Sequence, residues 1–331
     1  MGNEGMGAFT SALFGGSDKT ESKKFNFDKV QLHLHLDGCL RFSTILELAN
    51  KKHIDLRGAK TIDDLKKLLV TTKPTSLAEV LGAFDIFLPV IIGDLEAIER
   101  VAYEACEDQH KDGVIYFEGR YSPHLLSTET VGPSDVVKAV WKGFERGHKD
   151  FGIIARSIIC CIRGHDVWNK GLVQLAFDHK DHGVVAIDAA GCSHGADEQY
   201  EPSVVAAFLR AESLGIHRTV HAGESGGAQS VIRDEEAYKK FALEGRLHLE
   251  ACPFSSVMTA AVSPTWTEHP VKRWAKDGAN FSISTDDPTC FDNSVAKIWQ
   301  CQLNAAHSAF LEDSEKEKLV QRILKCRPLS N

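Results

Sequence analysis

Two histidines lie two residues apart in an apolar stretch of the chain, and their spacing points to chemistry. His33 and His35 both belong to the segment KVQLHLHL. Because successive side chains of a strand point to opposite faces, both imidazoles would lie on one face. Two imidazoles on one face can share a metal ion. The pair also has a second interpretation, because histidines at strand ends often hydrogen-bond to backbone groups.

Two more polar residues close later apolar segments and complete a set of metal ligands. His221 stands in RTVHAGE, and Asp286 stands in ANFSISTDDP. Three neutral imidazoles and one carboxylate suit Zn²⁺, with one coordination position left for water. HAGE could instead be a turn, and the aspartates of TDDP could cap a helix that begins at Pro288. The joint order of these pieces along one repeating pattern favours the metal site, with one zinc ion per chain.

A carboxyl group close to the third imidazole is a candidate general acid. Glu224 follows His221 by three residues, so its side chain would lie beside the ion without being a ligand. A partly desolvated carboxyl group can stay protonated near neutral pH and deliver its proton to a substrate. The alternative is an ion pair between Glu224 and a nearby arginine such as Arg218.

Short apolar segments that end in polar residues alternate with helical segments along the chain. The expected strands cover residues 30–36, 113–120, 153–163, 183–191, 218–224, 247–253 and 279–288. The clearest helical patterns cover residues 42–52, 135–147, 202–215 and 234–245, and several of them end in glycine, as helices tend to. This alternation predicts an α/β protein of the (β/α)8 TIM-barrel type, in which active-site side chains come from the carboxyl ends of the strands.

One strand of the expected barrel has no segment to form it. The connection between Glu224 and Asp234 is too short for a helix followed by a strand, although the other connections hold full helices. We therefore expect a barrel that is incomplete around its sixth strand. A longer excursion at residues 56–100 has apolar residues at helical spacing, and an insertion of this kind after a barrel strand usually covers the site.

Composition limits the class of protein. Of the 331 residues, 43% are hydrophobic and 25% are charged, which is ordinary for a globular chain and predicts one large domain over residues 25–331. Residues 1–24 are rich in Gly, Ser and Lys and contain no long apolar run, so we expect a flexible tail with neither a secretion signal nor a membrane span.

Charge and cysteine content narrow the partners and the compartment. The formal net charge is -8 and no cluster of Lys and Arg forms a basic stripe, which argues against nucleic-acid binding. The nine cysteines are scattered without a CxxC motif, as expected of free thiols in a reducing compartment. We expect a cytoplasmic monomer.

Five segments together resemble the motifs of the adenosine deaminase family: KVQLHLHLDG, YFEGRYSPHLL, VHAGE, CPFSS and SISTDDP. The resemblance runs from about residue 28 to residue 312. It implies that His33, His35, His221 and Asp286 are zinc ligands and that Glu224 is the proton donor to N1 of the purine.

The resemblance also implies residues that contact the substrate. Asp287 would be the acceptor that contacts N7, and Asp37, in the HLDG turn, would meet the ribose 5′-hydroxyl. Gly191, in DAAG, would lie against the base and bond N3. Leu81 and Phe84 would belong to a hydrophobic lid.

The implied reaction is hydrolytic deamination of adenosine, and of 2′-deoxyadenosine, to the inosine product and ammonia in purine salvage. A carboxylate at Asp37 would repel a 5′-phosphate, which favours a nucleoside over a nucleotide. Adenine deaminases and N6-methyl-AMP deaminases remain alternatives within the wider family. A metal hydrolase for amides or esters on the same barrel is a further alternative.

The chain departs from the family pattern after VHAGE. Family members continue with a helix and then a strand that ends in a GHG-type histidine, whereas this chain has no histidine between His221 and His248. His248 stands near the start of its strand and does not replace the missing group. A second shortening follows TDDP, and two such losses suggest a shortened isoform or an inaccurate gene model. Because one positioned group of this kind contributes about 10²-fold to 10⁴-fold in rate, the second hypothesis is a catalytically impaired protein that binds zinc and nucleoside.

Overall fold

The computed structural model describes residues 28–192, 201–224, 235–265, 268–293, 305–306 and 308–325. The expected tail at residues 1–24 and the short connection after Glu224 lie outside the described residues, as does much of the segment in which we expect the second shortening.

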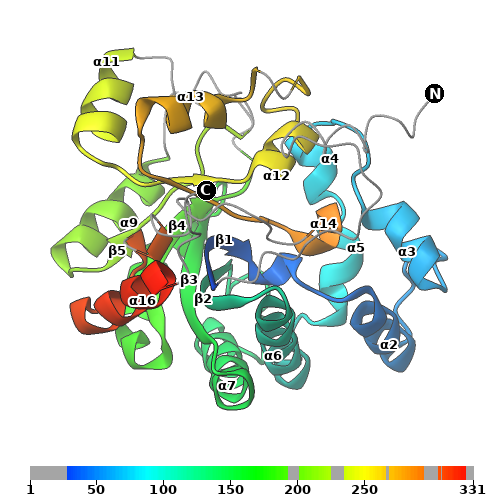
Figure 1. Cartoon of the computed structure of the whole chain (residues 1–331). Helices are drawn as coiled ribbons and strands as arrows, with labels where there is room; N and C mark the ends of the chain where they lie inside the picture. Colours follow the sequence, from blue (N-terminus) through cyan, green and yellow to red (C-terminus); the bar gives the residue numbers. More distant parts are fainter. Residues whose placement is uncertain are drawn as a thin grey trace.

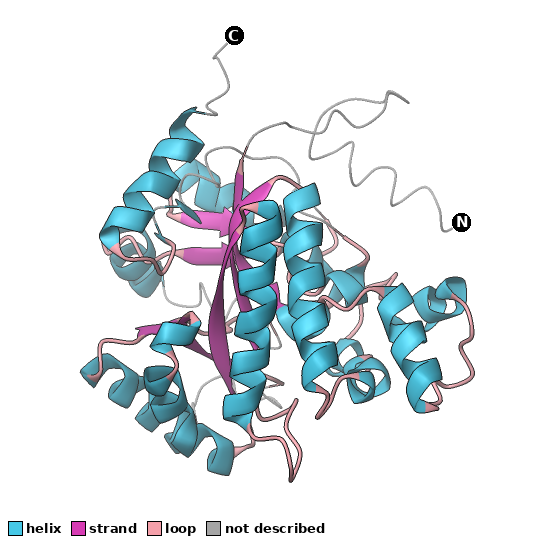
Figure 2. Cartoon of the chain, turned by 90° about the horizontal axis from the view of Figure 1, so that it is seen from below, coloured by secondary structure: helices cyan, strands magenta, loops and turns pink. Residues whose placement is uncertain are grey.

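The described strands form two parallel sheets that a single bridge joins. The strands are β1 (Lys29–His35), β2 (Val114–Tyr121), β3 (Ile154–Ile162), β4 (Val184–Ala190), β5 (His217–Arg218), β6 (Leu249–Ala251) and β7 (Phe281–Ile283). One sheet has the order β1-β2-β3-β4-β5 and the other pairs β6 with β7. An isolated parallel bridge between Leu34 and Asp286 places β7 beside β1. The order of neighbours is therefore β6-β7-β1-β2-β3-β4-β5. Figure 1 labels β1 to β5, and Figure 2 shows the strands from below.

This order confirms the α/β class and the barrel-type succession of parallel strands. All seven expected strands occur, but β5, β6 and β7 are shorter than expected. Within the described residues no ladder joins β5 to β6, which is the position where the sequence predicts an incomplete barrel. The chain after β5 still follows β4, because Thr219 N–H donates to Ile187 O at 3.0 Å and His221 N–H donates to Ala189 O at 3.1 Å.

Helices on the outer side of the strands cover them (Figure 1). The longer helices are α2 (Phe42–Lys52), α3 (Ile62–Leu69), α6 (Leu95–Lys111), α7 (Pro133–Phe151), α8 (Asp166–Asp178), α9 (Pro202–Ser213), α13 (Pro270–Asp277) and α16 (Asp313–Lys325). Shorter helical segments are η1 (Leu36–Gly38), α4 (Leu77–Leu81), α5 (Phe84–Phe87), η2 (Leu88–Val90), η3 (Lys180–His182), α11 (Glu235–Ala237), η4 (Tyr238–Glu244), α12 (Pro253–Met258) and α14 (Pro288–Phe291). None of the described helices combines the length and the apolar character needed to cross a bilayer.

The helix α7 runs past the glycine at which the sequence suggested its end. It continues to Phe151 and ends at Gly152, whose φ is 69°. A Cβ on Gly147 would lie 2.4 Å from Cβ of Cys106 in α6. Gly147 is therefore a packing residue inside the helix, which lets α6 and α7 approach closely, and Gly152 supplies the left-handed conformation that ends a helix.

The strand β1 is apolar on one face and polar on the other, although it is buried almost throughout. Its polar face carries Gln31, His33 and His35. The Gln31 side-chain oxygen accepts hydrogen bonds from the Thr285 backbone and hydroxyl at 3.1 and 3.0 Å, so this face looks toward the segment after β7. The period of two thus directs the polar residues of β1 into the interior of the curved sheet.

The excursion after β1 is attached to the segments that follow β6 and β7. Thr75 N–H donates to Met258 O at 2.8 Å, and Thr71 N–H donates to Cys290 O at 2.9 Å. The expected covering position of this insertion agrees with these contacts, because they lie at the carboxyl side of both short strands.

Candidate metal centre

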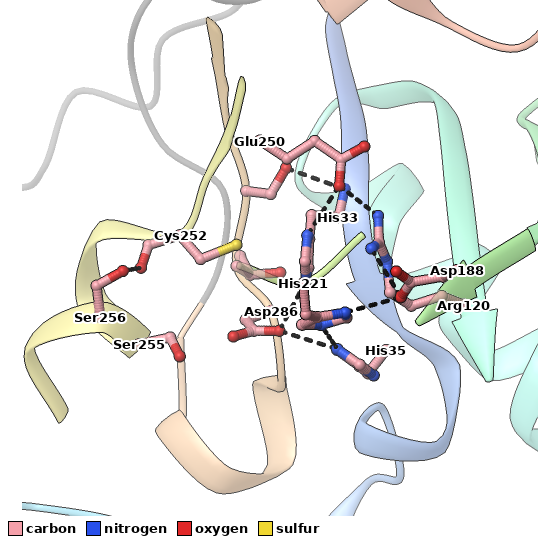
Figure 3. A network of polar contacts seen from close by, with 12 residues as sticks. His33, His35, Arg120, Asp188, His221, Glu250, Cys252, Ser255, Ser256 and Asp286 are labelled. Atoms are coloured by element: carbon pink, nitrogen blue, oxygen red, sulfur yellow. Dashed lines mark hydrogen bonds and ion pairs between the residues drawn. The ribbon is translucent and has the colours of Figure 1, made fainter. Parts of the chain in front are cut away.

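Three imidazoles and one carboxylate meet inside the curved sheet (Figure 3). His33 and His35 come from β1, His221 follows β5, and Asp286 follows β7. One side-chain donor atom from each of the four lies within 4.8 Å of the others. Nε2 of His33 and Nε2 of His35 lie 3.2 and 3.3 Å from Oδ1 of Asp286. The two nitrogens Nε2 of His35 and His221 are 3.0 Å apart.

These atoms can surround one cation. Ligands about 2.0–2.2 Å from a zinc ion lie about 3–4 Å from one another, and the three separations given above are 3.2, 3.3 and 3.0 Å. Nε2 of His33 and Oδ1 of Asp286 are buried, and neither has a hydrogen-bond partner among the described residues. Buried polar atoms without partners are costly, so a group that satisfies both of them is expected between them.

The backbone at Asp286 is held in an unusual conformation that directs its carboxylate inward. Its φ is 70°, a left-handed value that is uncommon outside glycine. Hydrogen bonds to β1 fix it: His35 N–H donates to Asp286 O at 3.0 Å, and Asp286 N–H donates to His33 O at 3.3 Å. Such strain is typical of functional sites, where the surrounding structure over-determines one residue.

The charges around the imidazoles favour a cation. Burial lowers the pKa of His35 well below its ordinary value, which leaves a neutral ring of the kind that binds metals. Burial and Arg120 also lower the pKa of His33, but the carboxylates of Asp286 and Glu250 outweigh them and raise it to about 9. The negative charge that attracts a proton to His33 would equally attract a metal ion.

Glu224 is partly buried and close to the same cluster. Burial, followed by the Asp286 carboxylate, raises the pKa of Glu224 above its ordinary value. The alternative pairing with Arg218 does not occur, since that guanidinium contacts Glu212 at 3.2 Å. Glu224 therefore has the environment of a carboxyl group that holds its proton.

Two further aspartates lie next to the cluster. Asp37, in η1, is buried and accepts a hydrogen bond from Ser122 N–H at 3.5 Å. Asp287 is at the N-cap position of α14, but its side chain makes no cap hydrogen bond. A Cβ on Gly38 would lie 2.1 Å from Oδ1 of Asp287, so only glycine at position 38 leaves room for that carboxyl group. The helix-cap interpretation of TDDP thus explains the backbone at Pro288 but not the side chain of Asp287.

The remaining expected contact residues lie on two other segments. Gly191 directly follows β4 with a φ of 91°, and its carbonyl accepts a hydrogen bond from Arg163 at 2.6 Å. The same guanidinium donates to the carbonyl of His221 at 2.7 Å. Leu81 ends α4, and Phe84 packs on Phe87 with ring centroids 4.9 Å apart. These contacts place the pair in the excursion without joining it to the four candidate ligands.

Three charged side chains that surround the imidazoles are absent from the site residues expected from the sequence. Arg120 in β2 and Asp188 in β4 are fully buried, and Glu250 lies in β6. The signal for them was the presence of single charged residues inside otherwise apolar strands, as in VVAIDAA.

Comparison with protein families gives a match over nearly the whole described chain. The adenosine deaminase family model matches residues 28–234 and 230–326. The two matched pieces meet at residues 230–234, in the connection where the sequence predicts that family residues are missing.

Curated relatives with sequence similarity are themselves adenosine deaminases. The protein from Xenopus laevis is 39% identical over 349 residues, which cover 92% of this chain and 96% of the relative. The Bos taurus protein is 37% identical, with 92% of this chain and 96% of the relative covered. The 349 aligned positions exceed the 331 residues of this chain, so the relative carries internal residues without a counterpart here.

Solved structures of similar fold confirm the architecture. Adenine deaminase from Arthrobacter aurescens has a TM-score of 0.77 and 20% identity, with 90% of this chain and 98% of that chain covered. The N6-mAMP deaminase from Arabidopsis has a TM-score of 0.77 and 23% identity, with 91% and 99% covered. An amidohydrolase from Burkholderia ambifaria with bound Zn has a TM-score of 0.77 and 21% identity, with 95% and 96% covered. At these identities the likeness shows the fold alone, whereas the family match and the curated relatives show that the chain belongs to the adenosine deaminase family, whose members are hydrolases that deaminate adenosine.

Proposed function

We propose that this chain is a zinc-dependent adenosine deaminase that converts adenosine and 2′-deoxyadenosine, with water, to the corresponding inosine and ammonia. The convergence of His33, His35, His221 and Asp286 on one point carries the proposal. These four residues would hold a zinc ion, which would supply Lewis-acid activation of water.

The proton that the purine needs is proposed to come from Glu224. Addition of water at C6 places negative charge on the ring unless N1 is protonated at the same time. The raised pKa of Glu224 supports a carboxyl group that keeps its proton to higher pH than an ordinary glutamate and can donate it to N1. One proton of the water replaces the one that Glu224 gives to N1. The other goes to the amino group at C6, which leaves as ammonia, and the oxygen of the water stays on C6 as the carbonyl of inosine.

Asp287 is proposed to contact N7 of the base. The resemblance to the family suggested an acceptor at this residue, but N7 is itself an acceptor. Burial and the neighbouring carboxylates of Asp286 and Asp37 raise the pKa of Asp287 well above its ordinary value. This favours a protonated carboxyl group that donates a hydrogen bond to N7.

The remaining contacts are proposed on the family pattern. Asp37 would bind the ribose 5′-hydroxyl, Gly191 would lie against the base near N3, and Leu81 and Phe84 would form the apolar lid. The positive φ of Gly191 supports a close approach of the backbone to a flat ring, because a glycine exposes no Cβ there.

The cellular setting is proposed to be purine salvage in the cytoplasm, by a monomer that binds neither nucleic acid nor membrane. All seven cysteines within the described residues are free, which supports a reducing compartment.

A catalytically impaired protein that still binds zinc and nucleoside is the second candidate. It is favoured by the lack of a histidine between His221 and His248 and by the split family match at residues 230–234. In this case the metal and the nucleoside would bind while the addition step stays slow.

A steady-state assay of the purified chain separates the two candidates. Ammonia release would be measured with adenosine, 2′-deoxyadenosine, adenine and N6-methyl-AMP. A turnover of about 1–10³ s⁻¹ with adenosine, the range of ordinary enzymes, would support the deaminase. Turnover below that range, with stoichiometric zinc and measurable adenosine binding, would support the impaired binder.

Two histidine variants provide the matched control for the metal assignment. His221→Ala should lose stoichiometric zinc. His217→Ala should keep it, because His217 lies in the same segment but is exposed and stacks on Phe310. Zinc content measured by atomic absorption that is equal in both variants would refute the assignment.

A further inference from the structure

Arg120 joins two carboxylates in the interior of the curved sheet. Its side chain is fully buried, with Nη1 3.2 Å from Oδ2 of Asp188 and Nη2 2.5 Å from Oε2 of Glu250. Nη2 also donates to the carbonyl of Leu32 at 2.8 Å. Figure 3 shows this guanidinium between the two acidic side chains. A buried charge of this kind is stable only when it is paired and hydrogen-bonded.

Each of these carboxylates also contacts one of the candidate ligands. Oε2 of Glu250 lies 2.9 Å from Nδ1 of His33, and Oδ2 of Asp188 lies 2.8 Å from Nδ1 of His221. A carboxylate beside Nδ1 keeps the proton of a neutral imidazole on that nitrogen. The lone pair then resides on Nε2, the atom that faces the other candidate ligands.

Glu250 also connects β6 to the segment after β5, two edges that no ladder joins in the described part of the chain. Its Oε1 accepts a hydrogen bond from the hydroxyl of Thr219, just after β5, at 3.3 Å. Glu250 itself lies in β6. One carboxylate therefore links the ends of both sheets, in the part of the barrel where β5 and β6 share no described pairing.

The charges of Arg120, Asp188 and Glu250 do not cancel, which indicates a role beyond packing. One guanidinium faces two carboxylates, so a negative charge remains beside the imidazoles. Apolar residues of similar volume would usually stabilise a core as well as buried ions do. A remaining negative charge is useful if the imidazoles hold a cation.

We propose that Glu250 and Asp188 are positioning residues that fix His33 and His221 with Nε2 presented to the metal, and that Arg120 holds both carboxylates in place. The inference rests on the proposed zinc site.

Zinc affinity of the folded chain tests this directly. Glu250→Gln keeps the shape of the side chain but removes its charge and one acceptor, and Asp188→Asn does the same on the other branch. Each should weaken zinc binding by about 10-fold to 100-fold, the usual loss when such a partner of a ligand is changed. The dissociation constant would be measured by competition with a chromophoric chelator, together with circular dichroism to verify folding.

Nitrogen NMR of protein labelled at histidine gives a readout that general destabilisation does not produce. In the metal-free wild type, at a pH at which both imidazoles are neutral, the rings of His33 and His221 should carry the proton on Nδ1. The Glu250→Gln variant should shift the His33 signals toward a tautomer mixture and leave those of His221 unchanged, and Asp188→Asn should do the reverse.

Two variants that touch the same carboxylates without changing them serve as controls. Thr219→Val removes the hydrogen bond to Oε1 of Glu250, and Cys160→Ala removes a thiol whose Sγ lies 3.7 Å from Oδ2 of Asp188. Both should keep wild-type zinc affinity and wild-type tautomers.

The outcomes separate this inference from the proposed function. A wild-type chain that binds no zinc would overturn the function and the inference together. A wild type that binds zinc while Glu250→Gln and Asp188→Asn bind it equally well, with unchanged tautomers, would overturn the inference alone. If one variant fails to fold, the other branch still decides, because the two carboxylates act on different histidines.

Discussion

The two parts of the sheet differ in how firmly the backbone alone holds them. In the first part, β2 and β3 have 8 and 9 residues and pair along most of their length. In the second part, β5 has 2 residues and β6 and β7 have 3 each. Long ladders fix many residues together, whereas short ones leave each residue dependent on side-chain contacts.

The candidate metal site spans both parts. His33 and His35 stand on β1, which is paired along β2, while His221 and Asp286 stand just beyond short strands. Two backbone hydrogen bonds hold Asp286 and one holds His221, together with side-chain contacts to neighbouring charged groups. A metal ion would therefore couple the firmly held pair His33 and His35 to His221 and Asp286, which have little backbone support.

Zinc removal should have the largest effect. The place in the sheet where protection from hydrogen exchange is lost would show whether the two parts differ in backbone support. Chelation should abolish deamination and lower the free energy of unfolding by about 2.7 kcal/mol relative to protein at free zinc 100 times Kd. Hydrogen exchange should show the loss of protection concentrated in residues 219–221, 249–251 and 281–283, with little change in β2. The His221→Ala variant should not respond to chelation. Uniform loss of protection over both parts would contradict the claim that the short strands depend more on the metal than the long ones do.

A substitution at the contact between the two parts should have the next largest effect. Gly38→Ala would place a Cβ 2.1 Å from Oδ1 of Asp287 and force that carboxyl group away. Because small displacements in a site can cost about 10²-fold, kcat/KM for adenosine should fall about 10-fold to 100-fold. Gly171→Ala is the control, since a Cβ there meets nothing within 4 Å. Unchanged activity in Gly38→Ala would show that Asp287 does not need its present position.

The smallest expected effect concerns Glu118 in β2, in the first part of the sheet, and the pH dependence of the stability of the fold. Burial raises the pKa of Glu118 from 4.5 to about 7, although its carboxylate accepts hydrogen bonds from Tyr116 OH and Phe310 N–H. The folded chain therefore holds this proton longer than the unfolded chain, and the fold loses stability as pH rises from about 4.5 through about 7.

Glu118→Gln should remove that loss, because the amide still accepts both hydrogen bonds but cannot ionise. Urea unfolding should give a gain on the order of 2 kcal/mol at pH 8 relative to wild type, shrinking toward zero at pH 4. The exposed Glu129→Gln variant should show no such difference between the two pH values. An equal effect of Glu118→Gln at both values would contradict the assigned environment.

Several features of this protein follow from the sequence alone. The alternation of apolar strands with helices predicts the parallel α/β order, because the backbone period of each element is local. The spacing of His33 and His35 predicts that both rings share a face. The short connection after Glu224 predicts an incomplete barrel, and no ladder joins β5 to β6 within the described residues. The role of each candidate ligand stays a prediction that the zinc measurements above would test.

Only the tertiary structure decided which charged groups meet. Arg218 pairs with Glu212 rather than Glu224. Gly147 packs against Cys106 instead of ending its helix. The contact of Glu250 with His33 joins residues 217 positions apart. Local periodicity fixes the face on which a side chain lies, but its partner across the sheet depends on strand order and register, which arise only when distant segments pair.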